Sequence, residues 1–197
     1  PLVLEPLLPV AIQSQLWSAG YLFVLGLVAL SAFLMPKAAA LSPPTVQETT
    51  PPDWSIVGRW IVLAAVPSGL MLSTSLHLTT DIVAMPLLWV LPLGLYLLSF
   101  SAAFATDRRL ADFCRRFAPF VILMAACSAF MDSTRFPFSF ALLTLVNLFV
   151  VSVTLHSEMF ARRPHPEHLT RFYLAMSVGG VIGGIFCAIL APLIFDW

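Results

Sequence analysis

The sequence predicts an all-α fold, a polytopic bundle in which about six helices cross a membrane. Of the 197 residues, 59% are hydrophobic and only 10% are charged, whereas soluble proteins average about 25% charged residues. Several apolar runs approach or exceed the roughly 20 residues that a helix needs to cross the hydrocarbon core. A soluble fold of this size could not bury so much apolar surface, so we expect lipid to cover the excess. The predicted spans are 16–35, 56–76, 82–104, 113–132, 136–160 and 169–195.

The chain is interpreted as a single transmembrane domain, residues 1–197, and as a fragment of a longer protein. It begins with Pro1 and an apolar stretch that lacks the basic head of a signal peptide. The first predicted span carries Trp17 and Tyr21 where aromatic residues gather at a membrane interface. Residues 38–55 contain four prolines, which cannot continue a helix. We expect this segment to be an exposed linker.

The second and third predicted spans are joined by a polar segment, which we expect to form the tight turn of an antiparallel hairpin. His77 and Asp81 are four residues apart, so on a continuous helix they would share a face and could form a proton or cation site. The alternative is a capped turn, in which Thr79, Thr80 or Asp81 accepts hydrogen bonds from the first amides of the third span. Short loops favour the capped turn.

Polar residues also occur in the fifth predicted span. Asn147 lies deep within it, where an interhelical hydrogen bond is the favoured interpretation. His156 and Glu158 lie near its end, where a functional site and a solvated helix-end role are equally good interpretations. The fourth predicted span is the weakest, because its uncharged part, residues 117–131, is short.

The last predicted span has the clearest packing signal. Small residues recur every fourth position, and such spacing lets two helix backbones approach closely. We therefore expect this helix to pack tightly against another one. A phosphate-binding loop is disfavoured, because the segment GGVIGG lacks the G-x-G-x-x-G order and follows no strand. The packing residues are Ala175, Gly179 and Gly183 on one ridge and Gly180 and Gly184 on the next.

The basic residues predict the orientation of the chain. In a six-span threading, nine of the ten lysines and arginines fall on one side, and only Arg135 falls on the other. Basic residues of short loops are retained in the cytoplasm. We therefore expect the arginine-rich loops 105–116 and 161–171 to be cytoplasmic.

Several functional classes are disfavoured by the sequence. A formal net charge of zero argues against a nucleic-acid partner. No nucleophile elbow, metal-ligand cluster or dinucleotide fingerprint is present, so we predict no catalytic residue, no metal and no cofactor. The expected partners are the lipid bilayer and other transmembrane helices.

Residues in two segments together resemble a known family. The stretch from Trp54 to Trp197 is similar to the membrane portion of bacterial fused proteins of the spermidine synthase-like class. Where that family more often has Cys-His-Gly-Glu-Leu, this chain has Leu-His-Ser-Glu-Met at 155–159. The resemblance is carried by the paired glycines and by Thr80, Asp81, Pro86, Trp89, Pro92, Tyr96, His156, Glu158, Pro164, Leu169, Thr170, Phe172 and Tyr173.

The resemblance implies a multi-pass inner-membrane module that accompanies an aminopropyltransferase-like domain located outside this chain. The module itself would be non-catalytic. Two alternatives stay open from the residues alone. One is an accessory subunit that packs in a larger membrane complex through the glycine ridge. The other is part of a small-molecule transporter, since proline-broken helices often form sites near the middle of the membrane.

Overall fold

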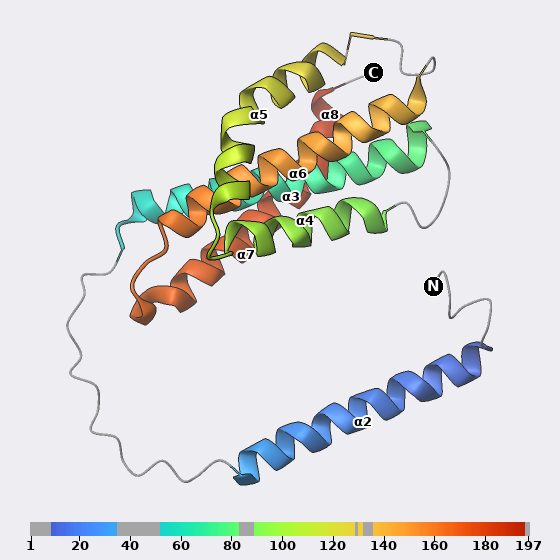
Figure 1. The fold of residues 1–197 in the computed structure, drawn as a ribbon, viewed down its shortest axis with the longest axis vertical. Coiled ribbons are helices and arrows are strands. Elements are labelled where there is room, and N and C mark those ends of the chain that lie inside the picture. Colours follow the sequence, from blue (N-terminus) through green and yellow to red (C-terminus); the bar gives the residue numbers. More distant parts are fainter. Residues whose placement is uncertain (1–8, 35–51, 83–88, 129, 132–135, 196–197) are drawn as a thin grey trace. The chain divides into compact units, whose positions relative to one another are not determined.

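A computed structural model of the chain describes residues 9–34, 52–82, 89–128, 130–131 and 136–195. These residues form helices and no strand, which confirms the all-α prediction. They belong to two compact units, Pro1–Glu48 and Thr49–Trp197. Figure 1 shows the helices of both units.

The first unit contains one described helix, α2 (Val10–Leu34). It begins earlier than the predicted span 16–35, because the residues before Leu16 hold no glycine or proline after Pro9 that would stop a helix. None of its residues is buried within the unit. Of the predicted linker 38–55, residues 38–51 lie outside the described part of the chain.

The second unit begins with α3 (Trp54–His77), capped by Asp53, and the helical path continues as a π-helical turn, η1 (Leu78–Ile82). The prediction of a tight turn after His77 is therefore wrong. The segment 77–81 contains no glycine or proline to end the helix. Thr79 and Thr80 donate hydrogen bonds back to carbonyls of the preceding turn. The amides of residues 83–88, which they are predicted to cap, lie outside the described residues, so the capping stays a prediction.

Three further helices follow in the chain. They are α4 (Val90–Ala103), α5 (Arg109–Ser128) and α6 (Pro137–Ala161). The described α4 is shorter than the predicted span 82–104, part of which lies outside the described residues. The α5 helix starts before the predicted residue 113, because the arginine-rich segment is itself helical and carries Asp112 in its first turn, where a negative charge is favourable.

The last helical path runs with little interruption to residue 194. A short 3-10 turn, η3 (Pro166–His168), leads into α7 (Leu169–Ile185), which continues through the π-helical turn η4 (Phe186–Leu190) into α8 (Ala191–Ile194). This path agrees closely with the predicted span 169–195. Pro192 stands in the first turn of α8, directly after η4, so the amide hydrogen that proline lacks is missing where the hydrogen-bond pattern changes from π-helical to α-helical.

Four helical segments of the described chain are long and apolar enough to cross a membrane by length and composition. The short α4 is apolar but falls below that length, and α5 opens with a charged segment. The structure thus supports a helical bundle with several membrane-compatible helices. The four segments are Val10–Leu34, Trp54–Thr80, Pro137–Ala161 and Pro166–Ile194.

Two clusters form the core of the second unit. The first joins α3 to α7, where the ring of Trp60 meets that of Phe172 edge-on at 5.1 Å between centroids. The second joins α5 to α6 through small side chains, including Ala111 and Val153. The α6 helix contributes to both clusters, and it packs against α3, α4 and α5 (Figure 1).

Candidate functional site

The most enclosed ionisable side chain of the described structure is His156, in the last third of α6. Its side chain is completely buried, as is that of Ser99 on α4. His156 Nδ1 lies 2.9 Å from Ser99 Oγ. The two residues are far apart in the sequence, so the packing of α4 against α6 creates this contact.

The hydrogen bonds of Ser99 determine which nitrogen of His156 carries the proton. Ser99 Oγ donates to the carbonyl oxygen of Tyr96 at 2.6 Å. A hydroxyl has a single hydrogen, so Ser99 Oγ is left to accept a hydrogen bond from His156. The neutral imidazole therefore carries its hydrogen on Nδ1, and Nε2 presents a lone pair.

Aromatic rings from α4 hold the imidazole in place. Phe100 stacks on it, with centroids 3.7 Å apart and planes 20° from parallel. Tyr96 meets it edge-on at 5.5 Å. Residues 96 and 100 are one turn apart, so a single face of α4 supplies both rings and places Ser99 beside them. This arrangement fixes the orientation of the imidazole plane.

The buried face of α6 carries several polar atoms that have no hydrogen-bond partner among the described residues. Besides His156 Nε2, they are Ser152 Oγ, Ser157 Oγ and Asn147 Oδ1. Ser152 and His156 are four residues apart, so they are neighbours on one face of the helix. Buried polar atoms normally find a partner, and this row of open donors and acceptors is therefore the strongest chemical feature of the helix. For Asn147 the predicted interhelical bond is not made by its side-chain oxygen.

His156 can accept a hydrogen bond or a proton through Nε2, or donate a single nitrogen ligand. Within the described residues, no group of three or more histidines, cysteines or carboxylates is placed to hold a metal ion. The cluster thus has the composition of a polar relay or a buried recognition group. Because Ser99 donates its hydrogen to Tyr96 and not to His156, this pair does not have the nucleophile–base arrangement of a hydrolytic triad.

Glu158, two residues further along α6, has different surroundings. Its carboxylate forms an ion pair with Arg162 at 2.5 Å and lies 3.9 Å from Arg115 of α5. These contacts correspond to the helix-end interpretation of Glu158. The carboxylate thus joins α6 to α5 at their charged end.

Arginines gather at this end of the second unit. Arg108 and Arg163 both lie over the ring of Phe160, 5.3 and 4.1 Å from its centroid. Arg171 lies over Trp54 at 4.6 Å. The first two contacts join the segment before α5 to the end of α6, and the third joins the start of α7 to the start of α3. Trp60 Nε1 donates to the carbonyl oxygen of Arg162 at 3.1 Å, which links α3 to the end of α6 (Figure 1).

The other predicted polar residues lie at the far end of α3. His77 is half-buried and Thr80 is exposed; both line a cavity between α3 and the end of the α7 path. Asp81 belongs to η1, but its side chain lies outside the described part. The predicted pairing of Asp81 with His77 therefore stays a prediction.

The predicted packing glycines divide into two groups. Gly179 and Gly183 face α3, where a Cβ at either position would overlap the carbonyl oxygen of Ile61 or Ala65. Ala175 is buried beside them in the first core cluster. The neighbouring ridge is looser: a Cβ at Gly180 would meet only Ser68 Oγ at 3.9 Å, and one at Gly184 would meet nothing within 4 Å.

Sequence reasoning missed the partners of His156. Ser99, Phe100 and Tyr96 sit in an apolar run with no unusual spacing relative to His156, so only the packing of α4 on α6 reveals them. The one available signal was a serine placed between two aromatic residues on the same helical face. Comparisons with protein-family models, curated proteins and solved structures find no match to this chain.

Proposed function

We propose that the chain is a multi-pass module of a bacterial inner-membrane protein of the spermidine synthase-like class, with its arginine-rich end in the cytoplasm. One observation carries the membrane part of the proposal. Long helices expose large apolar side chains along their length, while Arg108, Arg163 and Arg171 lie at one end of the bundle.

The exposed apolar surface is extensive on helices that also contribute to the core. Val62 of α3, Leu142 of α6 and Leu174 of α7 are each more than 60% exposed. Contiguous apolar surface of this kind marks contact with another protein or a membrane. Because the exposed positions lie on segments of membrane-spanning length, lipid is the partner that covers all of them at once.

The asymmetric charge supports the orientation. Arginines at membrane depth are expensive, but at a helix end they reach the interface. The contacts of Arg108 and Arg163 with Phe160, and of Arg171 with Trp54, place such residues from separate segments at helix ends, where they can reach this membrane interface. Retention of basic residues on the inner side favours a cytoplasmic position for this interface.

Cysteine labelling from the two faces of intact cells tests this topology. The probe variants are Arg109→Cys and His165→Cys at the arginine-rich end and Phe138→Cys at the start of α6, all at exposed positions. The native cysteines Cys127 and Cys187, which are not fully buried, are replaced by alanine beforehand. We expect positions 109 and 165 to react only after the inner face is opened and position 138 to react from outside. Labelling of 109 and 165 from opposite sides would overturn the proposal.

The family part of the proposal rests on the resemblance of residues 54–197 to the spermidine synthase-like class. It predicts that the reading frame of the natural gene continues past Trp197 into an aminopropyltransferase-like domain. Sequencing the gene in both directions from this segment is the direct test. A different downstream domain would remove the family assignment and leave the membrane topology unaffected.

A second candidate function, transport of a small molecule, is favoured by one observation. The two π-helical turns η1 and η4 both line the same cavity of about 820 Å³. Such turns occur often at functional sites. In proteoliposomes, flux of the carried molecule should fall in Thr79→Val and stay unchanged in Thr154→Val, a threonine outside the cavity. Equal flux in both variants would count against transport.

A further inference from the structure

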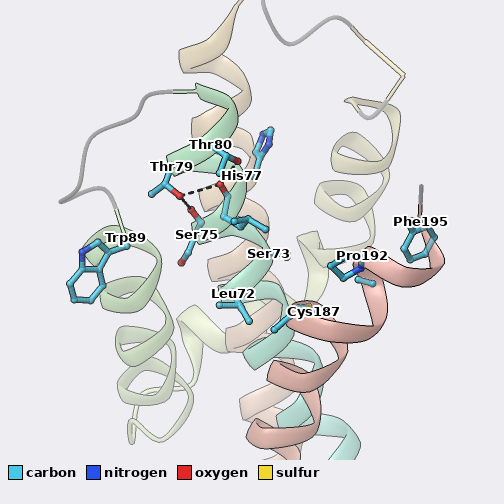
Figure 2. A pocket seen from close by; sticks show the side chains of 13 residues that line it. Leu72, Ser73, Ser75, His77, Thr79, Thr80, Trp89, Cys187, Pro192 and Phe195 are labelled. Atoms are coloured by element: carbon cyan, nitrogen blue, oxygen red, sulfur yellow. Dashed lines mark hydrogen bonds between the residues drawn. The ribbon is translucent and has the colours of Figure 1, made fainter. Parts of the chain in front are cut away.

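The cavity at the end of α3 is large enough to hold a small molecule. Its volume is about 820 Å³, within the range of about 300–1,000 Å³ typical of ligand sites. Its walls come from the last turns of α3, from η1, from Trp89 before α4, and from η4 and α8 (Figure 2).

The packing of α3 on α7 explains why a cavity opens here. The two helices are in close contact as far as Gly69, whose carbonyl oxygen accepts a hydrogen bond from Cys187 Sγ at 3.2 Å. Cys187 also lines the cavity, so the cavity begins where the close contact ends. Beyond it, η1 and η4 replace the regular α-helical turns on the two sides.

The hydroxyl groups of the cavity present acceptors. Ser73, Ser75 and Thr79 each donate to a backbone carbonyl three or four residues earlier, at 3.1, 2.8 and 2.8 Å. Because each hydroxyl has a single hydrogen, its lone pairs are what it can offer to a bound molecule. Thr80 likewise donates to the carbonyl of Leu76 at 2.7 Å. A ligand that matches these groups must therefore supply hydrogen-bond donors.

The remaining lining is mostly apolar and aromatic, and His77 adds an imidazole to it. Leu72, Leu76 and Pro192 give it an apolar wall, and Trp89 and Phe195 add aromatic rings that are about half exposed. Figure 2 shows Thr79 on the side of the helix that faces Trp89, with Phe195 on the other side. Aromatic faces attract organic cations.

The formal charges of the lining residues bear on the charge of the ligand. Among the residues that the structure describes in this lining, there is no lysine, arginine, aspartate or glutamate. An anionic head would meet lone pairs and aromatic faces, which repel it, and neither a lysine nor an arginine among the described lining residues to balance it. A primary ammonium group supplies three donors to lone pairs and a positive charge to an aromatic face.

We propose that this cavity binds the primary ammonium head of an amphiphile, between the Ser75 and Thr79 hydroxyls and Trp89, with the apolar body along Leu72, Leu76 and Pro192. The head belongs either to a lipid with an aminoethyl headgroup or to a free alkylamine. This inference uses the cavity alone, so it holds whether or not the chain is of the spermidine synthase-like class.

Calorimetric titration of the full chain in neutral detergent tests the ligand class, with dodecylammonium as the probe. We compare it with dodecyltrimethylammonium, which has the charge without N–H donors, and with dodecanoate, which has the opposite charge. We expect one saturable site for dodecylammonium, with affinity at least about tenfold above that of either comparison amphiphile. Equal affinity for dodecanoate would overturn the proposal.

A pair of threonine variants tests the location. Thr79→Val removes an acceptor in the cavity, and Thr154→Val makes the same change at a threonine on α6 that donates to the carbonyl of Val150 at the same distance of 2.8 Å. We expect about tenfold weaker dodecylammonium binding in Thr79→Val only. Circular dichroism confirms that both variants are folded. Equal weakening in the two would overturn the assignment to this cavity.

Trp89 variants and photolabelling give evidence that does not depend on the threonines. Trp89→Leu should weaken binding, whereas Trp89→Phe, which keeps an aromatic face, should restore most of it. A photoreactive dodecylammonium should label residues 72–80 and 187–195, and labelling elsewhere would overturn the proposal.

Competition experiments identify the source of the ammonium head. Competition by phosphatidylethanolamine assigns the natural head to a lipid, and competition by soluble alkylamines alone assigns it to a free amine. Either result supports the proposed chemistry.

Discussion

Ser99 and His156 form a hydrogen bond between two helices in a fully buried place, with 2.9 Å between Oγ and Nδ1. Ser99 also donates to the carbonyl of its own helix, so it can only accept from the imidazole. One small side chain on α4 thus fixes both the tautomer and the position of the only histidine in the described core.

Removing the Ser99 hydroxyl should destabilise the bundle. In Ser99→Ala, His156 Nδ1–H loses its acceptor in a place that water does not reach, and an unsatisfied buried donor costs about 1–3 kcal/mol. Thermal unfolding in detergent measures the loss. Ser101→Ala, at an exposed position two residues away, should change the midpoint little. Equal effects of the two substitutions would contradict the assigned hydrogen bond.

The same geometry predicts the tautomer of His156. With ¹⁵N-labelled histidine, the four histidine side chains can be resolved, and the signals of His156 identified by their absence in His156→Phe. We expect its neutral ring to carry hydrogen on Nδ1, with Nε2 unprotonated. A ring protonated only on Nε2 would mean that Ser99 donates to the imidazole and would exclude the arrangement described.

Glycine substitutions should separate the two ridges of α7. Gly179→Ala and Gly183→Ala place a methyl group against backbone of α3, which cannot yield as a flexible side chain can. Overpacking of this kind costs about 1–3 kcal/mol. Loss of thermal stability in detergent is the measurement.

Gly184→Ala is the matched control on the same helix, because a methyl group there meets nothing within 4 Å. It should be neutral or stabilising by up to about 1 kcal/mol, since alanine is the better helix former. If all three substitutions have the same effect, the close approach of α7 to α3 does not depend on the glycine ridge.

Much of the fold follows from the sequence, because apolar run length and small-residue spacing are local properties. The span 169–195 and the helix after Asp53 are examples, and the spacing of Gly179 and Gly183 indicates a close helix contact before any partner is known. The turn expected at 77–81 is not formed, because polarity alone does not end a helix that lacks glycine or proline.

The site is predictable only in part. His156 can be selected as a polar residue in an apolar run, but its surroundings depend on which helix packs beside α6. Ser99 differs from Ser101 only in lying between Tyr96 and Phe100 on one helical face, and this position does not say which helix will contact it. Glu158, selected for the same reason as His156, lies in an arginine cluster at the helix end, because two positions on a helix differ by about 200° in direction.

The Glu158 ion pairs should contribute little to stability. Arg162 and Arg115 are both substantially exposed to solvent, and exposed pairs are typically worth about 0–1 kcal/mol. Glu158→Gln should therefore lower the free energy of unfolding by at most about 1 kcal/mol, and the difference from the natural chain should shrink as salt is added. Unfolding at low and high ionic strength measures both effects. A large, salt-independent loss would indicate a role for Glu158 beyond these pairs.

The start of α3 should depend on pH through Asp53. Its carboxylate accepts hydrogen bonds from Ser55 Oγ and the amide of Trp54, each at 2.8 Å, and these bonds lower the pKa of Asp53 below its ordinary value of 3.8. A depressed pKa in the folded state stabilises the helix start at pH values above the ordinary one, and this contribution is lost as the pH falls through the lowered pKa. Amide hydrogen exchange at residues 54–57 should therefore show local fraying at acidic pH.

Two variants of Asp53 separate the charge from the capping hydrogen bond. Asp53→Asn, which caps a helix without titrating, should fray less than the natural chain at acidic pH, and Asp53→Ala should fray at every pH. Identical profiles for the natural chain and Asp53→Asn would show that the carboxylate does not control this helix end.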